Sequence, residues 1–173
     1  MDQENEILLE TSIFRVIRKQ EVLKNGVIKT REVIQHPGAV AIVPLVDKDR
    51  VCLIDNVRSA VGETLIEIPA GTLEANEDPQ IAAVRELGEE TGYRAGHIET
   101  LCQCFMSPGF LKERLHLFLA TDLVPGQMAL EDGEQITTRV VACSEALQMV
   151  RDGRIHDAKT IVGLLYYEQF RSS

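Results

Sequence analysis

The segment from Gly71 to Tyr93 constrains the fold most, because its residues mark both ends of one short helix. Asp78 followed by Pro79 is typical of a helix N-cap and first turn, and Gly92 is typical of the residue that ends a helix. These signals predict a helix over residues 79–91.

The predicted helix has an apolar side and an acidic side. At about 100° per residue, Ile81, Val84 and Leu87 fall on one side, which we expect to pack against the core. The other side gathers three carboxylates, those of Glu86, Glu89 and Glu90. One face is therefore expected to pack while the other presents acid.

The three carboxylates are unfavourably placed on such a helix. They lie at the negative end of the helix macrodipole, and Glu86 and Glu90 repel each other at i,i+4, each effect costing roughly a few tenths of a kcal/mol. Arg85 can reach Glu89, but one guanidinium does not neutralise three carboxylates. Clustered carboxylate oxygens suit Mg²⁺ or Mn²⁺, so a divalent metal site is one interpretation. An ordinary solvated helix face is the alternative.

The residues around the glutamates resemble the signature of the Nudix hydrolases at each defined position and with the spacing of that family. The matching residues are Gly71, Glu77, Arg85, Glu86, Leu87, Glu89, Glu90, Gly92 and Tyr93. The resemblance is strict over this segment and looser from about Arg31 to Phe170. It implies an α+β fold, an α/β/α sandwich with a Nudix-type mixed β-sheet between helices.

The rest of the chain predicts strands on both sides of the acidic helix. Strands are expected over residues 12–22, 26–34, 39–45, 51–56, 97–105, 114–123 and 134–143, and helices over residues 144–152 and 158–170. The first two strands are joined at Lys24-Asn25-Gly26, a short hairpin turn. This order is typical of a mixed α/β or α+β sandwich. We therefore expect an N-terminal β-hairpin region, residues 1–36, followed by a catalytic domain, residues 37–173.

Composition limits the class of protein. A length of 173 residues with 45% apolar and 26% charged residues is ordinary for a soluble globular chain. The chain has neither an apolar run long enough to span a bilayer nor a cationic start that leads into an apolar stretch. We therefore expect a cytoplasmic location and no membrane partner. A net charge of -9 without a Lys/Arg cluster argues against a nucleic-acid surface. Four cysteines without CxxC spacing indicate reduced thiols.

Three features outside the signature resemble the ADP-ribose pyrophosphatase branch of the family. Glu67 begins a Glu-X-Pro-Ala-Gly approach to the signature, Arg58 follows the second strand of the expected catalytic domain, and Pro108 lies in a Ser-Pro-Gly loop. Each feature alone is typical of a turn or a surface residue. Their order and spacing favour the branch. It implies hydrolysis of ADP-ribose to AMP and ribose 5-phosphate.

The branch also implies roles for individual residues. Metal ions, Mg²⁺ or alternatively Mn²⁺, would be held by Glu86, Glu89, Glu90 and the carbonyl of Ala70. Arg85 would orient Glu89, and a glutamate of a late loop would act as the base, with Glu134 preferred and Glu131 as the alternative. The expected substrate contacts are Arg58, Glu67, Pro108 and Glu32, with Arg31 beside the last of these.

The resemblance leaves the substrate and the assembly partly open. The branch usually forms homodimers through its N-terminal strands, so we expect the hairpin to dimerise and to lie near the nucleotide. A pyrophosphatase for another nucleotide sugar, such as GDP-mannose, is an alternative, because the same motifs do not separate the two activities. A non-catalytic Nudix domain that senses ADP-ribose is a third possibility.

Overall fold

The structure is a computed structural model that describes residues 6–171. Its backbone divides into two compact units, and each is described by itself. The first unit comprises Met1–Gly38 and Cys104–Leu115, and the second comprises Ala39–Gln103 and His116–Ser173. Residues 104–115 therefore join the N-terminal segment, whereas the sequence placed them within the region 37–173.

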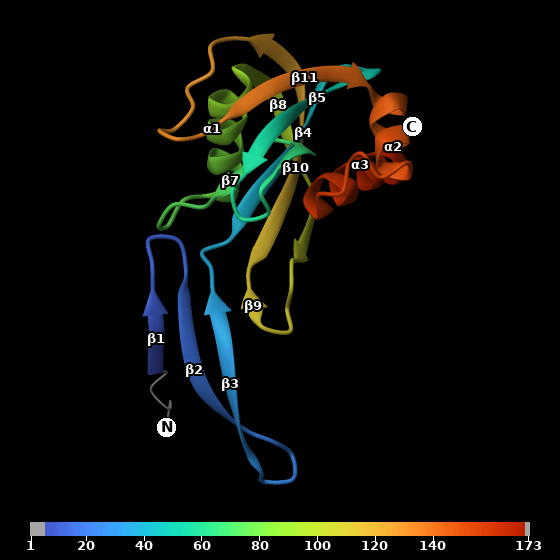
Figure 1. The fold of residues 1–173 in the computed structure, drawn as a ribbon. Coiled ribbons are helices and arrows are strands. Elements are labelled where there is room, and N and C mark those ends of the chain that lie inside the picture. Colours follow the sequence, from blue (N-terminus) through green and yellow to red (C-terminus); the bar gives the residue numbers. More distant parts are fainter. Residues whose placement is uncertain (1–5, 172–173) are drawn as a thin grey trace. The chain divides into compact units, whose positions relative to one another are not determined.

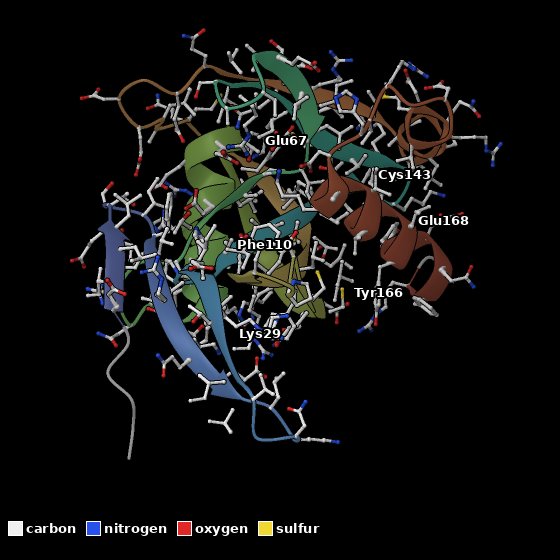
Figure 2. All side chains as sticks on the ribbon, turned by 60° about the horizontal axis from the view of Figure 1, so that its bottom comes forward. Lys29, Glu67, Phe110, Cys143, Tyr166 and Glu168 are labelled. Carbon is white, nitrogen blue, oxygen red and sulfur yellow. The ribbon has the colours of Figure 1, made fainter. Side chains whose placement is uncertain are left out.

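The first unit is built on the predicted hairpin. β2 (Arg15–Val22) and β3 (Ile28–Gln35) pair antiparallel, and Lys29, labelled in Figure 2, lies opposite Glu21. The turn closes where the N–H of Leu23 donates to the carbonyl of Val27 at 2.8 Å. Two further strands complete the sheet, β1 (Glu6–Glu10) beside β2 and β9 (Leu111–Lys112) parallel to β3.

The larger sheet belongs mainly to the second unit and has the order β11-β5-β4-β10-β8, with β6 paired to β5 and β7 paired to β4 (Figure 1). Its strands are β4 (Ala39–Asp47), β5 (Arg50–Arg58), β6 (Glu63–Glu67), β7 (Ala70–Thr72), β8 (Tyr93–Phe105), β10 (Arg114–Pro125) and β11 (Ile136–Ala142). Its helices are α1 (Pro79–Thr91), α2 (Cys143–Arg151) and α3 (Ala158–Phe170). The short strands β1, β6, β7 and β9 were not predicted from the sequence.

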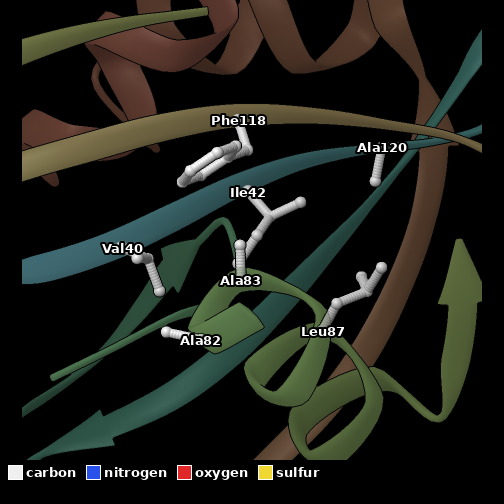
Figure 3. Packing of buried hydrophobic residues seen from close by; sticks show 7 residues of the cluster. All are labelled: Val40, Ile42, Ala82, Ala83, Leu87, Phe118 and Ala120. Carbon is white, nitrogen blue, oxygen red and sulfur yellow. The ribbon is translucent and has the colours of Figure 1, made fainter. Parts of the chain in front are cut away.

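One face of the larger sheet packs against α1. Successive side chains of a strand point to opposite faces, so Val40 and Ile42 of β4 share a face with each other. Figure 3 shows them meeting small residues of the helix, together with side chains of β10. The buried cluster consists of Val40, Ile42, Ala82, Ala83, Leu87, Phe118 and Ala120.

The opposite face packs against α3. A Cβ added at Gly163 of this helix would lie 3.0 Å from side-chain atoms of Val43 and Ile68 and 3.3 Å from one of Leu117. The helix therefore approaches the sheet closely at a position where only a glycine leaves room. Helices on both faces of the sheet confirm the predicted α+β sandwich.

The ends of α1 are as predicted, but its buried face is not. The Asp78 carboxylate accepts from two N–H groups of the first turn, and Gly92 ends the helix at φ +74°. However, Ile81 is 65% exposed and Val84 is 47% exposed, so the expectation that both pack in the core is wrong. The buried stripe runs instead along Ala82, Ala83 and Leu87, because two alanines let the helix backbone lie close to the sheet. No helix within residues 6–171 is both long and apolar enough to cross a membrane.

Candidate active site

Glu86 lies directly against the backbone of β7. A Cβ added at Gly71 would overlap the carboxylate of Glu86, so the strand and the acidic side of α1 are in contact only because residue 71 has no side chain. The Glu86 side chain is 12% exposed. Burial raises its pKa, and the negative charges of Glu89 and Glu134 raise it further, while Arg85 opposes the shift.

Glu90 is the most buried carboxylate of α1, with 2% of the residue exposed. Its Oε2 accepts a hydrogen bond from the N–H of Ala70 at 2.8 Å. Burial raises the pKa of Glu90 to about 8, with Glu86 and Glu134 adding to the shift and Ala70 and Arg58 opposing it. Near neutral pH the metal-free site therefore keeps a proton that a cation can replace.

Arg85 connects three acidic residues. Its Nε and Nη2 bind both oxygens of Glu77 at 3.0 and 3.1 Å, and its Nη1 donates to Glu86 at 2.7 Å and to Glu89 at 2.9 Å. The hydrogen bonds from Arg85 and from the N–H of Glu74 hold the pKa of Glu77 below its usual range. The contact expected between Arg85 and Glu89 is present, and Glu77 fixes the loop before the helix to the same guanidinium.

Arg58 and Glu67 form a second charged group on the strands beside the helix. The Nε and Nη2 of Arg58 donate to the two oxygens of Glu67 at 2.8 and 2.7 Å. Glu67, labelled in Figure 2, is fully buried, whereas 41% of the Arg58 side chain is exposed. The hydrogen bond to Glu67 raises the pKa of Arg58, and the charge of Glu90 also acts on it. Arg58 thus lies within electrostatic reach of the acidic side of α1.

Glu134 is the loop glutamate that acts on the acidic pair, since it raises the pKa of both Glu86 and Glu90. The N–H of Glu131 donates to the Glu134 carboxylate at 2.8 Å, which holds that side chain within its own turn. Upstream, the N–H of Ala129 donates to the carbonyl of Glu89 at 2.9 Å and ties the loop to the helix.

Gly92 makes the same tie possible. Gly92 has a positive φ, and it also lies close to the loop. A Cβ at this position would lie 3.0 Å from the backbone nitrogen of Met128 and 3.1 Å from the carbonyl oxygen of Gly126. The residue that ends α1 therefore also lets the loop pass against the end of the helix.

The other predicted substrate contacts belong to the first unit. Pro108 lines a cavity of about 580 Å³ together with Arg31 and residues of the neighbouring strands. Glu32 lies on β3, where its carboxylate accepts from the Nε of Arg18 at 3.1 Å. The remaining candidates, Arg58, Glu67, Ala70, Arg85, Glu86, Glu89, Glu90, Glu131 and Glu134, all belong to the second unit.

The acidic side of α1 offers only oxygen ligands. Across residues 6–171, no three His, Cys, Asp or Glu side chains stand together as a ready metal-binding group, and Glu86 and Glu89 both accept hydrogen bonds from Arg85. Even so, burial raises the pKa values of Glu86 and Glu90, neighbouring carboxylates raise them further, and the backbone of Gly71 lies directly beside Glu86. This donor set fits a hard divalent cation.

Three polar residues at the start of α3 were missed by the sequence analysis. Lys159 donates to the Glu67 carboxylate at 2.5 Å, and Asp157 accepts from Lys159 at 3.0 Å and caps the helix. The buried hydroxyl of Thr160 accepts from the N–H of Ile68 at 2.9 Å. Asp157 was detectable as an N-cap before the predicted helix, but nothing local marks a lysine that turns inward, because lysine is usually exposed.

Comparison with known proteins identifies the family. A family model described as the NUDIX domain matches residues 35–162. The chain belongs to the Nudix family. It is an enzyme of the Nudix hydrolase type. Both the intact signature over residues 71–93 and the relatives of the chain support this assignment.

Relatives of known function align with most of the chain. It is 37% identical to a methanol dehydrogenase activator of Bacillus methanolicus and 36% identical to an ADP-ribose pyrophosphatase of Bacillus subtilis, each over 84% of this chain and 80% of the relative. A GDP-mannose pyrophosphatase of Escherichia coli is 34% identical over 81% of this chain and 82% of its own length. A crystal structure of an ADP compounds hydrolase has the same fold, with a TM-score of 0.84 at 23% identity over 96% of this chain and 91% of that one.

Proposed function

We propose that this Nudix hydrolase cleaves the diphosphate of ADP-ribose to AMP and ribose 5-phosphate with the help of Mg²⁺, or alternatively Mn²⁺. The observation that carries the proposal is the pair of carboxylates formed by the buried Glu90 and the partly buried Glu86, with the partly exposed Arg58 within electrostatic reach of Glu90. An enzyme that cleaves a diphosphate needs carboxylates that hold a cation and an arginine that binds phosphate oxygens. The name of the Bacillus subtilis relative supports ADP-ribose.

In this proposal Glu86, Glu89, Glu90 and the Ala70 carbonyl hold the metal. When bound, the metal neutralises phosphate oxygens and lowers the pKa of water. Arg58 binds and orients the diphosphate, Glu67 fixes Arg58, and Arg85 positions Glu86 and Glu89. Glu134 takes a proton from the attacking water as its oxygen bonds to one phosphorus, and the bond from that phosphorus to the bridging oxygen breaks. Glu131 holds Glu134 through its backbone N–H.

A substrate panel tests this assignment. With Mg²⁺ at a saturating concentration, we expect kcat/KM for ADP-ribose to exceed that for GDP-mannose, UDP-glucose and NADH by about tenfold or more. This ratio corresponds to a difference of about 1.4 kcal/mol in transition-state binding. Phosphate release coupled to a phosphatase measures all four in one format. A preference for GDP-mannose would transfer the assignment to that sugar nucleotide, which the Escherichia coli relative makes the second candidate. Tight ADP-ribose binding without turnover of any compound would instead indicate a sensor.

We further propose that the first unit, including the hairpin expected over residues 1–36, forms a homodimer in which Glu32 and Pro108 meet the nucleotide. Several large apolar side chains of this unit are exposed in the single chain: Ile7, Leu9, Ile13, Val22, Val27, Ile28, Phe105 and Phe110. Such a surface in one small unit is typical of a protein interface. Light scattering after size exclusion should give twice the mass of the chain, and a monomer at micromolar concentration would contradict the dimer.

The proposed location is the cytoplasm. The four cysteines, Cys52, Cys102, Cys104 and Cys143, are free, as a reducing compartment would keep them. Burial raises the pKa of Cys52 to about 11, which keeps this thiol protonated.

A further inference from the structure

Glu67 is held by two cations at once. Arg58 binds both of its oxygens, and Lys159 donates to Oε2 at 2.5 Å. The side chain of Glu67 is 1% exposed and that of Lys159 is 13% exposed, so this ion pair is largely shielded from water, whereas 41% of the Arg58 side chain is exposed. Arg58, Lys159 and Glu67 alone therefore carry two positive charges against one negative charge, before Asp157 is counted.

Asp157 also contacts Lys159, but its charge is offset elsewhere. Its Oδ1 accepts from Lys159 at 3.0 Å, while its Oδ2 accepts from the N–H of Thr160 at 3.0 Å as the N-cap of α3. The partial positive charge of the helix N-terminus stabilises a carboxylate in this place. Lys159 therefore remains effective against the charge of Glu67.

The arrangement matters for Arg58. A guanidinium bound to one buried carboxylate has its charge cancelled, and a cancelled charge attracts a phosphate weakly. In this protein Nη1 of Arg58 is left out of the two bonds to Glu67, and 41% of the side chain remains exposed. A second cation on Glu67 offsets the carboxylate, so less of the positive charge of Arg58 is cancelled.

We propose that Lys159 is a positioning residue that offsets Glu67 and so keeps the charge of Arg58 available to the diphosphate of the substrate. This inference rests on the proposed function for the identity of that substrate. It assigns to the start of α3, 92 residues beyond Glu67 in the chain, a part in substrate binding.

A purely structural role of Lys159 makes a different prediction. The start of α3 is also anchored by Asp157 and by the buried Thr160 hydroxyl, which accepts from the N–H of Ile68 at 2.9 Å. These contacts stay when the lysine ammonium is removed. Loss of the charge should therefore alter substrate affinity more than stability.

The test compares Lys159→Met, which keeps the length of the side chain, with Lys159→Arg, which keeps the charge. Lys48→Met is the matched control, because the Lys48 side chain is 88% exposed. We expect Lys159→Met to raise KM for ADP-ribose by about tenfold or more, with a smaller change in kcat, and Lys159→Arg to recover most of the loss. An unchanged KM in Lys159→Met, or an equal defect in Lys159→Arg, would overturn the inference.

Binding of inorganic pyrophosphate with Mg²⁺, measured by calorimetry, gives a second readout that needs no turnover. We expect Lys159→Met to weaken this binding by about tenfold while the control binds like the wild type. Failure of the wild type to hydrolyse any nucleotide sugar would count against the proposed function alone. Equal pyrophosphate affinity in the wild type and Lys159→Met would count against the role of Lys159, whatever the substrate is.

Discussion

Replacing Glu90 by Gln is expected to lower kcat for the nucleotide sugar by about a thousandfold or more while the fold stays intact. Glutamine has the shape of glutamate, and its carbonyl oxygen can still accept from the N–H of Ala70. It lacks the charge that would hold the metal at the most buried glutamate of α1, and a metal supplies several kcal/mol of transition-state stabilisation. Steady-state kinetics at saturating Mg²⁺ measure the loss of kcat. Glu145→Gln is the control, because Glu145 of α2 is exposed.

The pH dependence of the stability of the same variant shows whether the Glu90 carboxylate takes up a proton in the native state. In the metal-free protein the pKa of Glu90 is about 8, compared with about 4.5 in the unfolded chain, so the native state binds the proton more tightly. The free energy of unfolding should therefore fall as pH rises from about 5 to about 8, by at most about 1.4 kcal/mol per pH unit from this group. Urea unfolding in EDTA should give a flatter profile for Glu90→Gln. Near-normal kcat in this variant would refute the assignment of Glu90 to the metal.

Replacing Gly71 by Ala should lower kcat by about a hundredfold through Glu86. The added methyl group would overlap the Glu86 carboxylate, and the movable end of that side chain would yield rather than the backbone of β7. Because the colliding atoms belong to a flexible side chain, we expect little change in the melting temperature. A carboxylate displaced by about 1 Å no longer fits the geometry that positions the reacting groups.

Gly88→Ala on the same helix is the matched control for Gly71→Ala. A Cβ at Gly88 would meet its nearest atom, the carbonyl oxygen of Tyr93, at 3.9 Å, which is ordinary contact. Alanine is favoured over glycine within a helix by about 1 kcal/mol, so this variant should melt higher and keep its activity. Full activity in Gly71→Ala would show that Glu86 does not need its present position.

The sequence predicted the elements whose signals are local. The cap at Asp78 and the stop at Gly92 define α1 as observed, and the expected helix over residues 158–170 coincides with α3. The hairpin followed from its turn, in which Gly26 adopts φ +80°. Such signals lie within a few residues of the element that they start or end, so a single sequence is enough to read them.

Features that depend on distant partners were not predictable in this way. β7 and β9 are three and two residues long and exist only because β4 and β3 offer them hydrogen bonds. The exposure of Ile81 and Val84 follows from how α1 is rotated on the sheet, which periodicity alone does not fix. The inward turn of Lys159 requires a buried carboxylate from β6, far away in the chain.

The acidic loop around Glu134 is attached at both of its ends. Ala129 is hydrogen-bonded to the end of α1, and at the other end the N–H of Val57 on β5 donates to the carbonyl of Gln135 at 3.2 Å. Residues 130–134, which lie between Ala129 and Gln135, take part in neither of these two hydrogen bonds. Changing the residues of this loop other than Glu131 and Glu134 thus offers a way to redesign selectivity, since the hydrogen bonds that hold both ends of the loop lie outside the changed positions.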